Sequence, residues 1–292
     1  MARKGLTPRV RNDSHGVRML KGRTIAAVVP AYNEAELIGA TLEAIPAYVD
    51  EVIVVDDGSW DGTAQAAHAC SRRFELVAHG ANLGVGAAIA SGCTRAMTRD
   101  ADVAVVLAAD GQMSPEDLPS VLAPLLDEQA DFVKGDRLAW PRAEKHMPLH
   151  RFAGNHVLSW LTCRALGARV EDSQCGYVAF NRRALRTVRW EALWKGYGYP
   201  NDLLSEIIGH GLRMAEVPVR PVYGEERSGI RLRHALLVIP FVIARAWLRH
   251  SRWGAIEQPW PTSTSSTVMQ TASARSPSSA TPTRDEAPSS PA

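Results

Sequence analysis

Four short apolar runs, separated by longer helix-like stretches, constrain the fold of this chain most. They are rich in β-branched residues and lie at 24–30 (TIAAVVP), 51–57 (EVIVVDD), 74–79 (FELVAH) and 102–110 (DVAVVLAAD). Continuous apolar runs of this length are typical of strands buried on both faces, as in a parallel sheet. Helices are expected between them, over 34–45, 61–73 and 84–99. Such repeated units predict right-handed crossovers and an α/β, Rossmann-like half.

The second half of the chain is less regular. A helix near 115–128 precedes a fifth apolar strand, 131–137 (DFVKGDR). Further helices are expected near 151–166 and 201–211, and further strands near 176–181 and 213–219. A hydrophobic content of 46% with 22% charged residues supports a packed core.

The two ends of the chain differ from its balanced middle. Residues 1–22 show no periodicity and are expected to be a flexible, basic N-terminus, while 255–292 is rich in Ser, Thr, Pro and Ala and is expected to be disordered. Basic segments near both ends favour phosphates or acidic lipid headgroups as binding partners. The alternative is that these segments are basic tails that are simply solvated. The net charge of +2 provides no argument for a nucleic-acid partner.

The segment 231–254 contains a helical stretch, 232–250, that is apolar in its centre and rich in arginine. This centre is too short to span a bilayer and is interrupted by Pro240. Arginines and Trp247 around apolar residues suit an amphipathic helix at a membrane surface. A core helix packed on the main domain is the alternative.

Cysteine usage and the N-terminus bear on the cell compartment. The four cysteines form no CxxC pair, so we expect reduced thiols rather than a zinc site or disulfides. No apolar run follows the basic start, so no signal peptide is expected. The expected location is therefore the cytoplasm.

Ligands of open parallel sheets bind beyond the carboxyl ends of the strands, so the polar residues there are the candidate site. After the first strand, the Tyr32 ring and the Glu34 carboxylate could hold a nucleobase, although a plain turn with Asn33 capping the next helix is the alternative. After the second strand, the adjacent carboxylates Asp56 and Asp57 need a donor, such as a ribose or a base edge. Asp61 fits a structural helix start.

The end of the fourth strand indicates a metal site. Asp110 and Gln112 supply two hard oxygen ligands on a turn that contains Gly111, which suits Mg²⁺ or Mn²⁺. Such a cation bridges to substrate phosphates and stabilises charge on a departing diphosphate. The GVG sequence at 84–86 is weak evidence for NAD, because Ile89 occupies the third glycine position of the dinucleotide fingerprint.

Four motifs in order resemble one large family. They are VVPAYNEA (28–35), VDDGSWDGT (55–63), NLGVGAAIASG (82–92) and LAADGQM (107–113). Together they resemble the inverting glycosyltransferases of GT-A fold, of the family-2 type, and look most like the dolichol- or polyprenyl-phosphate sugar synthases. The resemblance covers about residues 23–230 and implies a mixed, mainly parallel sheet.

The resemblance implies roles at the donor side. Pro30, Tyr32 and Glu34 would line the base pocket, and Val55 and Asp57 would contact base or ribose. The family's metal motif is Asp-x-Asp-x-Gln, and here Ala108 replaces its first Asp. Ala109 and Asp110 would then lie at the donor, with Asp110 and Gln112 as the metal ligands.

Two arginines and one glutamine match later motifs of the family. Arg137 and Arg227 match phosphate-contacting positions, which suits the planar guanidinium, and salt bridges are the alternative for both. Gln174, in EDSQCGYVAF (171–180), matches an element at the acceptor side.

The expected reaction is an in-line displacement with inversion, from a UDP- or GDP-linked sugar to an acceptor, most simply a polyprenyl phosphate. A phosphate acceptor is already an anion, whereas a hydroxyl acceptor needs a general base. Asp172 and Asp202 are the candidate bases that accompany Asp110 as catalytic residues, and Asp202 also fits the first turn of a helix.

Three other functions remain open from the sequence. They are a soluble transferase acting on a hydroxyl acceptor, a degenerate nucleotide-sugar binding protein suggested by Ala108, and a nucleotidyltransferase. The last is disfavoured because AYNEAE stands where a glycine- and Lys/Arg-rich loop is expected. The expected location with a polyprenyl-phosphate acceptor is peripheral, on the inner face of the cell membrane. The sequence does not predict an oligomeric state.

Overall fold

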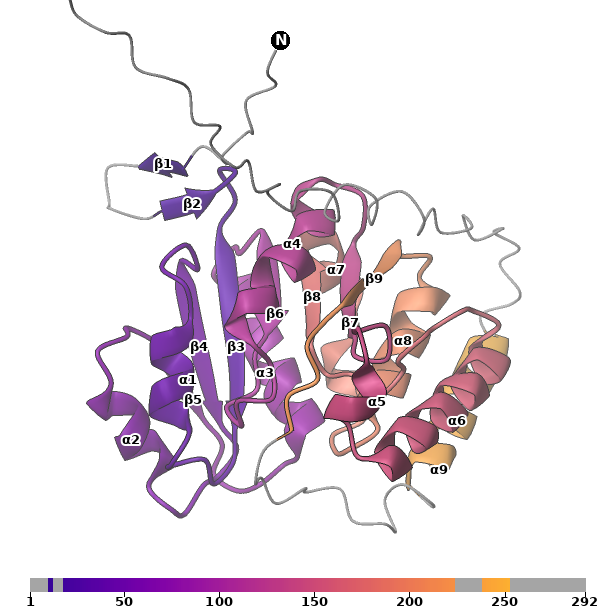
Figure 1. Ribbon diagram of the computed structural model, residues 1–292. Coiled ribbons are helices and arrows are strands. Elements are labelled where there is room, and N and C mark those ends of the chain that lie inside the picture. Colours follow the sequence, from indigo (N-terminus) through magenta and orange to yellow (C-terminus); the bar gives the residue numbers. More distant parts are fainter. Residues whose placement is uncertain (1–9, 13–17, 224–237, 253–292) are drawn as a thin grey trace, which may run out of the picture. The chain divides into compact units, whose positions relative to one another are not determined.

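A computed structural model describes residues 10–12, 18–223 and 238–252 of the 292-residue chain. In these residues a seven-stranded sheet has the order β5-β4-β3-β6-β8-β7-β9 (Figure 1). Its strands are β3 (Ile25–Ala31), β4 (Glu51–Asp56), β5 (Glu75–Ala78), β6 (Val103–Val106), β7 (Phe132–Asp136), β8 (Val178–Asn181) and β9 (Met214–Pro218). All four apolar runs of the first half are therefore strands of one sheet, as predicted.

The sheet is mixed and mainly parallel. β5, β4, β3 and β6 run parallel to one another, and β7 runs parallel to β9. β8 lies antiparallel between β6 and β7. The predicted α/β architecture is confirmed.

Helices cover both faces of the sheet. The helices are α1 (Ile38–Ala44), α2 (Thr63–Ala69), α3 (Val85–Thr98), α4 (Leu118–Leu126), α5 (Ala143–His146), α6 (Leu149–Leu166), α7 (Arg182–Thr187), α8 (Tyr199–Gly209) and α9 (Ile239–Arg252), with 3-10 turns η1 (Pro115–Asp117) and η2 (Trp190–Ala192). Alternate residues of β3 belong to two cores, one shared with α1, α2 and α4 and the other with α3, α7 and α8. Burial on both faces explains why these strands are continuously apolar.

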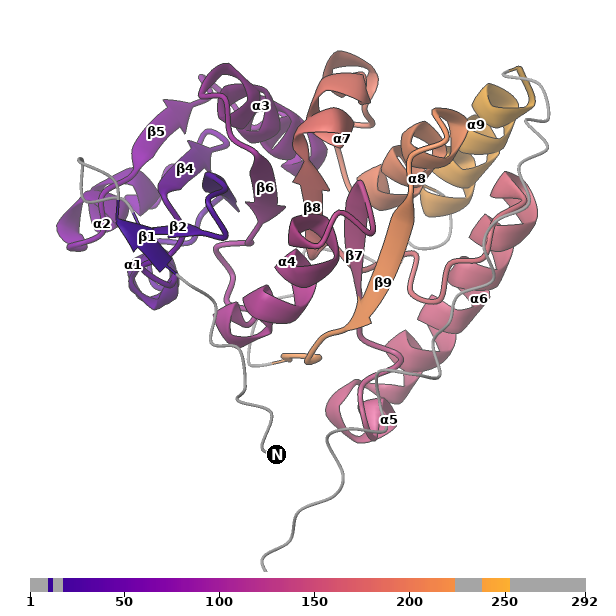
Figure 2. The same cartoon turned by 90° about the horizontal axis from the view of Figure 1, so that it is seen from above.

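The α6 and α9 helices lie side by side beside the β7–β9 end of the sheet, and α9 also packs on α8 (Figures 1 and 2). Ile239, Val242, Ile243 and Ala246 of α9 are buried. Among the described residues, no helix combines the length and the apolar character needed to cross a membrane.

Several boundaries differ from the expectation. The helix predicted from residue 34 begins at Ile38, because the Glu34 and Ala35 amides donate to Thr63 Oγ1 (2.9 Å) and Asp61 Oδ2 (3.1 Å) instead of entering a helix. The strand predicted to run to residue 110 ends at Val106. Short helices α5 and α7 and the turn η2 were not predicted.

The ends of the chain are described only in part. Within the N-terminus expected to be flexible, β1 (Val10–Asn12) pairs antiparallel with β2 (Arg18–Leu20). The predicted disordered tail at 255–292, the start of the predicted 232–250 helix and Arg227 lie outside the described residues.

Candidate active site

The carboxyl ends of β3, β4 and β6 meet at one edge of the sheet. The Asp57 amide donates to the Ala31 carbonyl (2.9 Å), and the Ala109 amide donates to the Pro30 carbonyl (3.3 Å). The segments that follow the three strands are therefore neighbours in space. This edge carries most of the donor-side residues that the sequence predicted.

The turn after β3 presents Tyr32 to solvent. Asn33 adopts a left-handed conformation (φ 56°), its amide donates to Ser59 Oγ (3.0 Å), and its side chain accepts from the Trp60 amide (3.1 Å). Asn33 therefore joins this turn to the loop after β4 and does not cap α1. With its backbone fixed in this way, Tyr32 remains 42% exposed, a suitable platform for a nucleobase.

The two adjacent carboxylates after β4 find their donors within the protein. Asp57 is buried and accepts from the Leu83 amide (3.0 Å), the Gly84 amide (2.8 Å) and His79 Nδ1 (2.6 Å). Asp56 Oδ1 accepts from the Ser59 amide (2.9 Å). In this structure Asp57 thus fixes the 82–84 loop beside the site, and its predicted contact with base or ribose stays a prediction.

Three residues that were predicted to bind the nucleotide-sugar donor have buried side chains. Pro30, Val55 and Ala109 lie in the core at the ends of their strands or just beyond. Only their main-chain atoms could reach a ligand at this edge. Their predicted role would therefore be to shape the floor of the site.

Asp110 and Gln112 lie on a partly exposed turn just beyond β6. Asp110 Oδ1 accepts from the Gln112 amide (3.0 Å), with Gly111 between them at φ 72°. Within the described residues, no group of three or more His, Cys, Asp and Glu side chains is arranged to hold a metal ion. Two oxygen-bearing side chains fit a Mg²⁺ or Mn²⁺ ion that completes its coordination with water and substrate phosphates.

Tyr197 is a candidate site residue that the sequence analysis did not name. Burial, together with the nearby carboxylates of Asp110 and Glu34, raises the pKa of its hydroxyl above the ordinary tyrosine value. The Tyr197 hydroxyl is thus close enough to Asp110, a predicted metal ligand, and to Glu34, a predicted base-pocket residue, for their charges to act on it. The aromatic and glycine-rich sequence at 194–199 (WKGYGY) was the available signal, since it matches no regular element.

The loop that carries Tyr197 is held against the start of α3. The Gly86 amide donates to the Lys195 carbonyl (2.7 Å). A Cβ atom at Gly86 would lie 2.0 Å from the Trp194 carbonyl oxygen, so only glycine permits this approach. The NLGVG motif therefore positions two loops, its own through Asp57 and the Tyr197 loop.

Arg137 and Asp172 form a buried ion pair. Arg137 Nε and Nη2 donate to the two carboxylate oxygens (2.7 and 3.0 Å), and Asp172 is completely buried. Burial would raise the pKa of Asp172, but the Arg137 guanidinium, with Lys134 nearby, holds this pKa below the ordinary aspartate value. The salt-bridge alternative for Arg137 is therefore present in the structure.

Gln174 connects the 171–177 segment to α8. The side-chain Nε2 of Gln174 donates to Ser173 Oγ (2.7 Å) and to Asn201 Oδ1 (3.3 Å), and Asn201 Oδ1 also accepts from Thr162 Oγ1 (2.7 Å). Gln174 remains partly exposed. Its predicted place at the acceptor side stays a prediction.

Asp202 lies in the first turn of α8 and is completely buried. It accepts from the Trp194 amide (2.8 Å) and pairs with Arg245 Nη1 of α9 (2.6 Å). One turn later, Glu206 pairs with Arg249 (2.6 Å) and Arg189 (2.9 Å). Asp202 therefore anchors both α9 and the loop that carries Tyr197.

Comparison with known proteins identifies the family of this fold and site. Residues 26–189, which include nearly all of β3, the strands β4 and β6 and the turn with Asp110 and Gln112, match the family described as Glycosyl transferase family 2. The chain belongs to this family. It is therefore a glycosyltransferase with the GT-A architecture that its motifs resemble.

Curated relatives cover most of the chain. It is 31% identical over 219 residues to the UDP-N-acetylglucosamine–dolichyl-phosphate N-acetylglucosaminyltransferase of Methanococcus voltae, a match that covers 70% of this chain and 87% of the relative. It is 30% identical over 225 residues to the polyprenol monophosphomannose synthase of Mycolicibacterium smegmatis, covering 73% of this chain and 84% of the relative. The first name specifies dolichyl phosphate as the acceptor, and the second specifies polyprenol monophosphomannose as the product.

Solved structures with the same fold include a different acceptor class. Glucosyl-3-phosphoglycerate synthase from Mycobacterium tuberculosis, in complex with Mn²⁺ and UDP-glucose, superposes with a TM-score of 0.60 at 25% identity. The superposition covers 79% of this chain and 80% of that structure. The synthase has also been solved with Mn²⁺, UDP and glucosyl-3-phosphoglycerate.

Proposed function

We propose that this glycosyltransferase transfers a hexose from a UDP- or GDP-linked donor to a polyprenyl phosphate, with inversion at the anomeric carbon. The acceptor phosphate oxygen attacks the anomeric carbon, and the bond from that carbon to the donor's phosphate oxygen breaks. The leaving group is a nucleoside diphosphate, and no proton is transferred. This site would work at the inner face of the cell membrane, where a lipid-linked acceptor is accessible.

One observation carries the choice of acceptor. Both carboxylates that could serve a hydroxyl acceptor as a general base, Asp172 and Asp202, are completely buried and paired with arginines. The pKa of Asp172 is also lowered, which makes its carboxylate a weaker base. A phosphate acceptor is ionised at neutral pH and needs no base. The names of the two relatives described above agree with such an acceptor.

The donor would bind at the carboxyl ends of β3, β4 and β6. Tyr32 would stack on the base, and Asp110 and Gln112 would hold Mg²⁺ or Mn²⁺ against the diphosphate. When bound, the cation supplies positive charge to stabilise the departing diphosphate. A synthase of the same fold solved with Mn²⁺ and UDP-glucose supports this choice of metal and donor.

Buried ion pairs would hold the acceptor side in place. Asp172 fixes the guanidinium of Arg137, which is partly exposed and could contact a phosphate. Gln174 lies on the same segment as Asp172. These residues would orient the two phosphates for in-line attack and leave the chemistry to the acceptor's own charge.

Direct transfer assays test the proposal. The full chain is incubated with labelled UDP- and GDP-sugars and Mn²⁺, with undecaprenyl phosphate or the matching alcohol undecaprenol. We expect labelled product only with the phosphate, carrying an inverted anomeric linkage by NMR. Product with undecaprenol would contradict the acceptor assignment.

A second candidate acceptor is 3-phosphoglycerate, because the solved synthase of similar fold is named for glucosyl-3-phosphoglycerate. It is tested in the same assay. Transfer to this compound in preference to undecaprenyl phosphate would make the enzyme a soluble-acceptor transferase. Donor binding without transfer to any acceptor would instead indicate a non-catalytic homologue, which Ala108 in the metal motif makes conceivable.

A further inference from the structure

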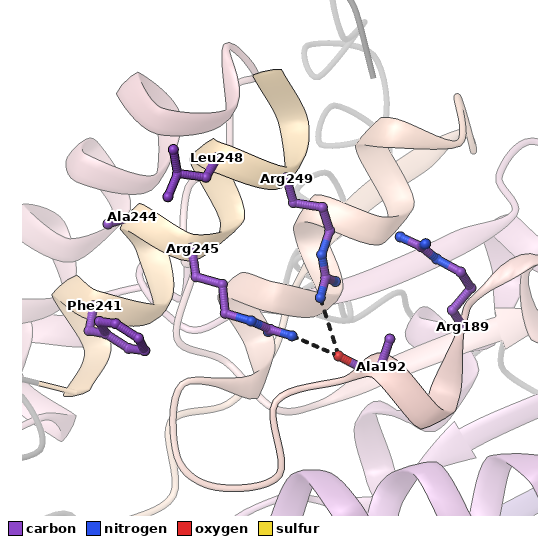
Figure 3. A pocket seen from close by; sticks show the side chains of 7 residues that line it. All are labelled: Arg189, Ala192, Phe241, Ala244, Arg245, Leu248 and Arg249. Atoms are coloured by element: carbon purple, nitrogen blue, oxygen red, sulfur yellow. Dashed lines mark hydrogen bonds between the residues drawn. The ribbon is translucent and has the colours of Figure 1, made fainter. Parts of the chain in front are cut away.

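The helix α9 contacts the Tyr197 loop, which we define as residues 192–198, from the end of η2 to the residue before α8. Arg245 and Arg249 of α9 donate to the Ala192 carbonyl at 3.0 and 3.3 Å (Figure 3). The two guanidinium groups therefore fix the first residue of the loop.

Further side chains of α9 pack on the middle and the end of the same loop. The Phe241 ring lies edge-on to the Trp194 ring, with the ring centroids 5.9 Å apart. The Arg245 guanidinium also lies 5.9 Å from the Trp194 centroid. At the end of the loop, Gly198 adopts φ 104°, and a Cβ atom there would lie 3.3 Å from Val242 of α9. The helix thus holds the loop at its start, middle and end.

A buried ion pair links these contacts to Tyr197. Asp202 is completely buried, pairs with Arg245 (2.6 Å) and accepts from the Trp194 amide (2.8 Å). The Trp194 indole Nε1 in turn donates to the Tyr197 carbonyl (3.1 Å). Removing the Arg245 guanidinium would leave the buried Asp202 carboxylate with Arg249 at the longer distance of 3.5 Å, a costly loss of compensating charge. The conformation of Trp194, and through it that of Tyr197, therefore depends on Arg245.

Hydrogen bonds also hold the Tyr197 loop at the carboxyl edge of the sheet. The Gly86 and Ala87 amides, in the first turn of α3, donate to the Lys195 carbonyl at 2.7 and 3.2 Å. The 83–84 amides just before this helix donate to Asp57, which directly follows β4. The loop therefore connects α9 to the edge where the donor is proposed to bind.

The residue that follows the loop lies near the predicted metal turn. A Cβ atom at Gly176 would lie 2.7 Å from the Tyr199 hydroxyl and 3.2 Å from Met113 Cε, so both side chains lie beside this glycine. Met113 Sδ accepts from the Ala108 amide (3.3 Å) in the metal motif. Tyr197 lies between the two anchored parts of the chain and is 39% exposed. Its ring is therefore held at the donor edge with part of its surface accessible to a ligand.

We propose that Arg245 of α9 is a positioning residue for donor binding, because it holds the Tyr197 loop where the Tyr197 hydroxyl meets the sugar diphosphate. The inference rests on the proposed function for the identity of this ligand. A phenol hydroxyl can donate a hydrogen bond to a phosphate oxygen, and hydrogen bonds to charged acceptors are the stronger ones. Burial raises the pKa of Tyr197, so its hydroxyl stays protonated and able to donate at neutral pH. The C-terminal helix would thus serve the donor side without touching the donor.

A double-mutant cycle of donor affinity tests the proposal. Full-length Arg245→Leu, Tyr197→Phe and the combined variant are titrated, in the presence of Mn²⁺, with the UDP- or GDP-sugar that binds the native protein. Each single change should weaken donor binding about tenfold. In the combined variant, Tyr197→Phe should add less than about twofold, because Arg245 acts through the same loop. Fully additive losses, or native affinity in either single variant, would overturn the proposal.

Arg213→Leu is the matched control for stability. Arg213 pairs with the buried Asp131 (3.0 Å) at the amino end of β7, on the sheet edge opposite the site. This variant should lower the unfolding temperature as Arg245→Leu does and keep the native donor affinity. An equal loss of donor affinity in both arginine variants would mean that Arg245 acts only through overall stability.

A milder variant keeps the test decisive if Arg245→Leu does not fold. Phe241→Ala removes the ring contact with Trp194, takes the place of Arg245→Leu in the cycle, and should weaken donor binding about threefold. Donor binding is measured without an acceptor, so a wrong acceptor assignment would leave these results unchanged. A native protein that binds no nucleotide-sugar would refute the proposed function itself. A native protein that binds a donor, with an uncoupled cycle, would refute only the positioning role.

Discussion

Replacing Asp172 by asparagine tests whether this carboxylate positions Arg137 or acts as a base. Asp172 accepts from the Arg137 amide (3.2 Å), Nε (2.7 Å) and Nη2 (3.0 Å), and from the Gln174 amide (3.2 Å). The variant removes the counter-ion of a largely buried guanidinium, which costs about 3 kcal/mol in the free energy of unfolding. In a domain of this size, that loss lowers the unfolding temperature by roughly 6–12 °C.

Thermal unfolding and steady-state kinetics of the same samples measure this prediction. Glu171→Gln is the matched control, because this neighbouring side chain is half exposed and pairs with Arg169 at the surface. Its removal should change stability by less than about 1 kcal/mol. We expect Asp172→Asn to lower both the unfolding temperature and kcat, with an unchanged shape of the pH profile of kcat/KM.

A different combination would refute this reasoning. If Asp172→Asn leaves the unfolding temperature within a degree or two of the native value but abolishes the acidic limb of the pH profile, Asp172 is a general base. The ion pair would then be secondary, and a hydroxyl acceptor would gain support.

Three further predictions follow from the site. Ala108→Asp restores the missing carboxylate of the metal motif and adds a second charged oxygen ligand, so it should raise the apparent affinity for Mn²⁺ about tenfold. The affinity is measured by titrating Mn²⁺ into the protein and the nucleotide-sugar donor. An unchanged affinity would show that the metal does not bind at the 108–112 turn. Gly86→Ala should lower the free energy of unfolding in urea by about 1–3 kcal/mol and slow sugar transfer, because the added Cβ would collide with the Trp194 carbonyl. Gly154→Ala on α6 is the control, since its Cβ would meet nothing within 4 Å and the variant should be as stable as the native protein. Glu216 of β9 accepts from the Glu171 amide (2.9 Å) and the Asp172 amide (3.4 Å), and burial raises the pKa of its carboxyl from 4.5 to about 7. The stability gained by its protonated form is therefore present below pH 4.5 and is lost as the pH rises through 7. Glu216→Gln should flatten the fall in unfolding temperature between about pH 5 and 8, and an unchanged fall would contradict this.

The sheet edge was predictable because its signals are local. Each strand is a continuous apolar run, and the polar residues of the site follow these runs directly, so Tyr32, Glu34, Asp110 and Gln112 could be placed from their order alone. Parallel strands bring their carboxyl ends to one edge, and the contacts of Asp57 with Ala31 and of Ala109 with Pro30 realise this arrangement.

The remaining features depend on contacts between distant segments. Asp202 pairs with Arg245, and Arg137 pairs with Asp172, across many intervening residues that carry no local pattern. Tyr197 reaches the site only because the loop before α8 packs on the glycines at the start of α3.

Thermal-shift titration with UDP-, GDP- and dTDP-sugars, with and without Mn²⁺, tests the central claim most directly. If oxygen ligands at the carboxyl edge of the sheet hold a cation against a sugar diphosphate, one donor should stabilise the native protein only with Mn²⁺. Asp110→Ala should lose this metal-dependent shift while keeping a native fold. An equal shift without metal, or an Asp110→Ala variant that responds like the native protein, would contradict the account.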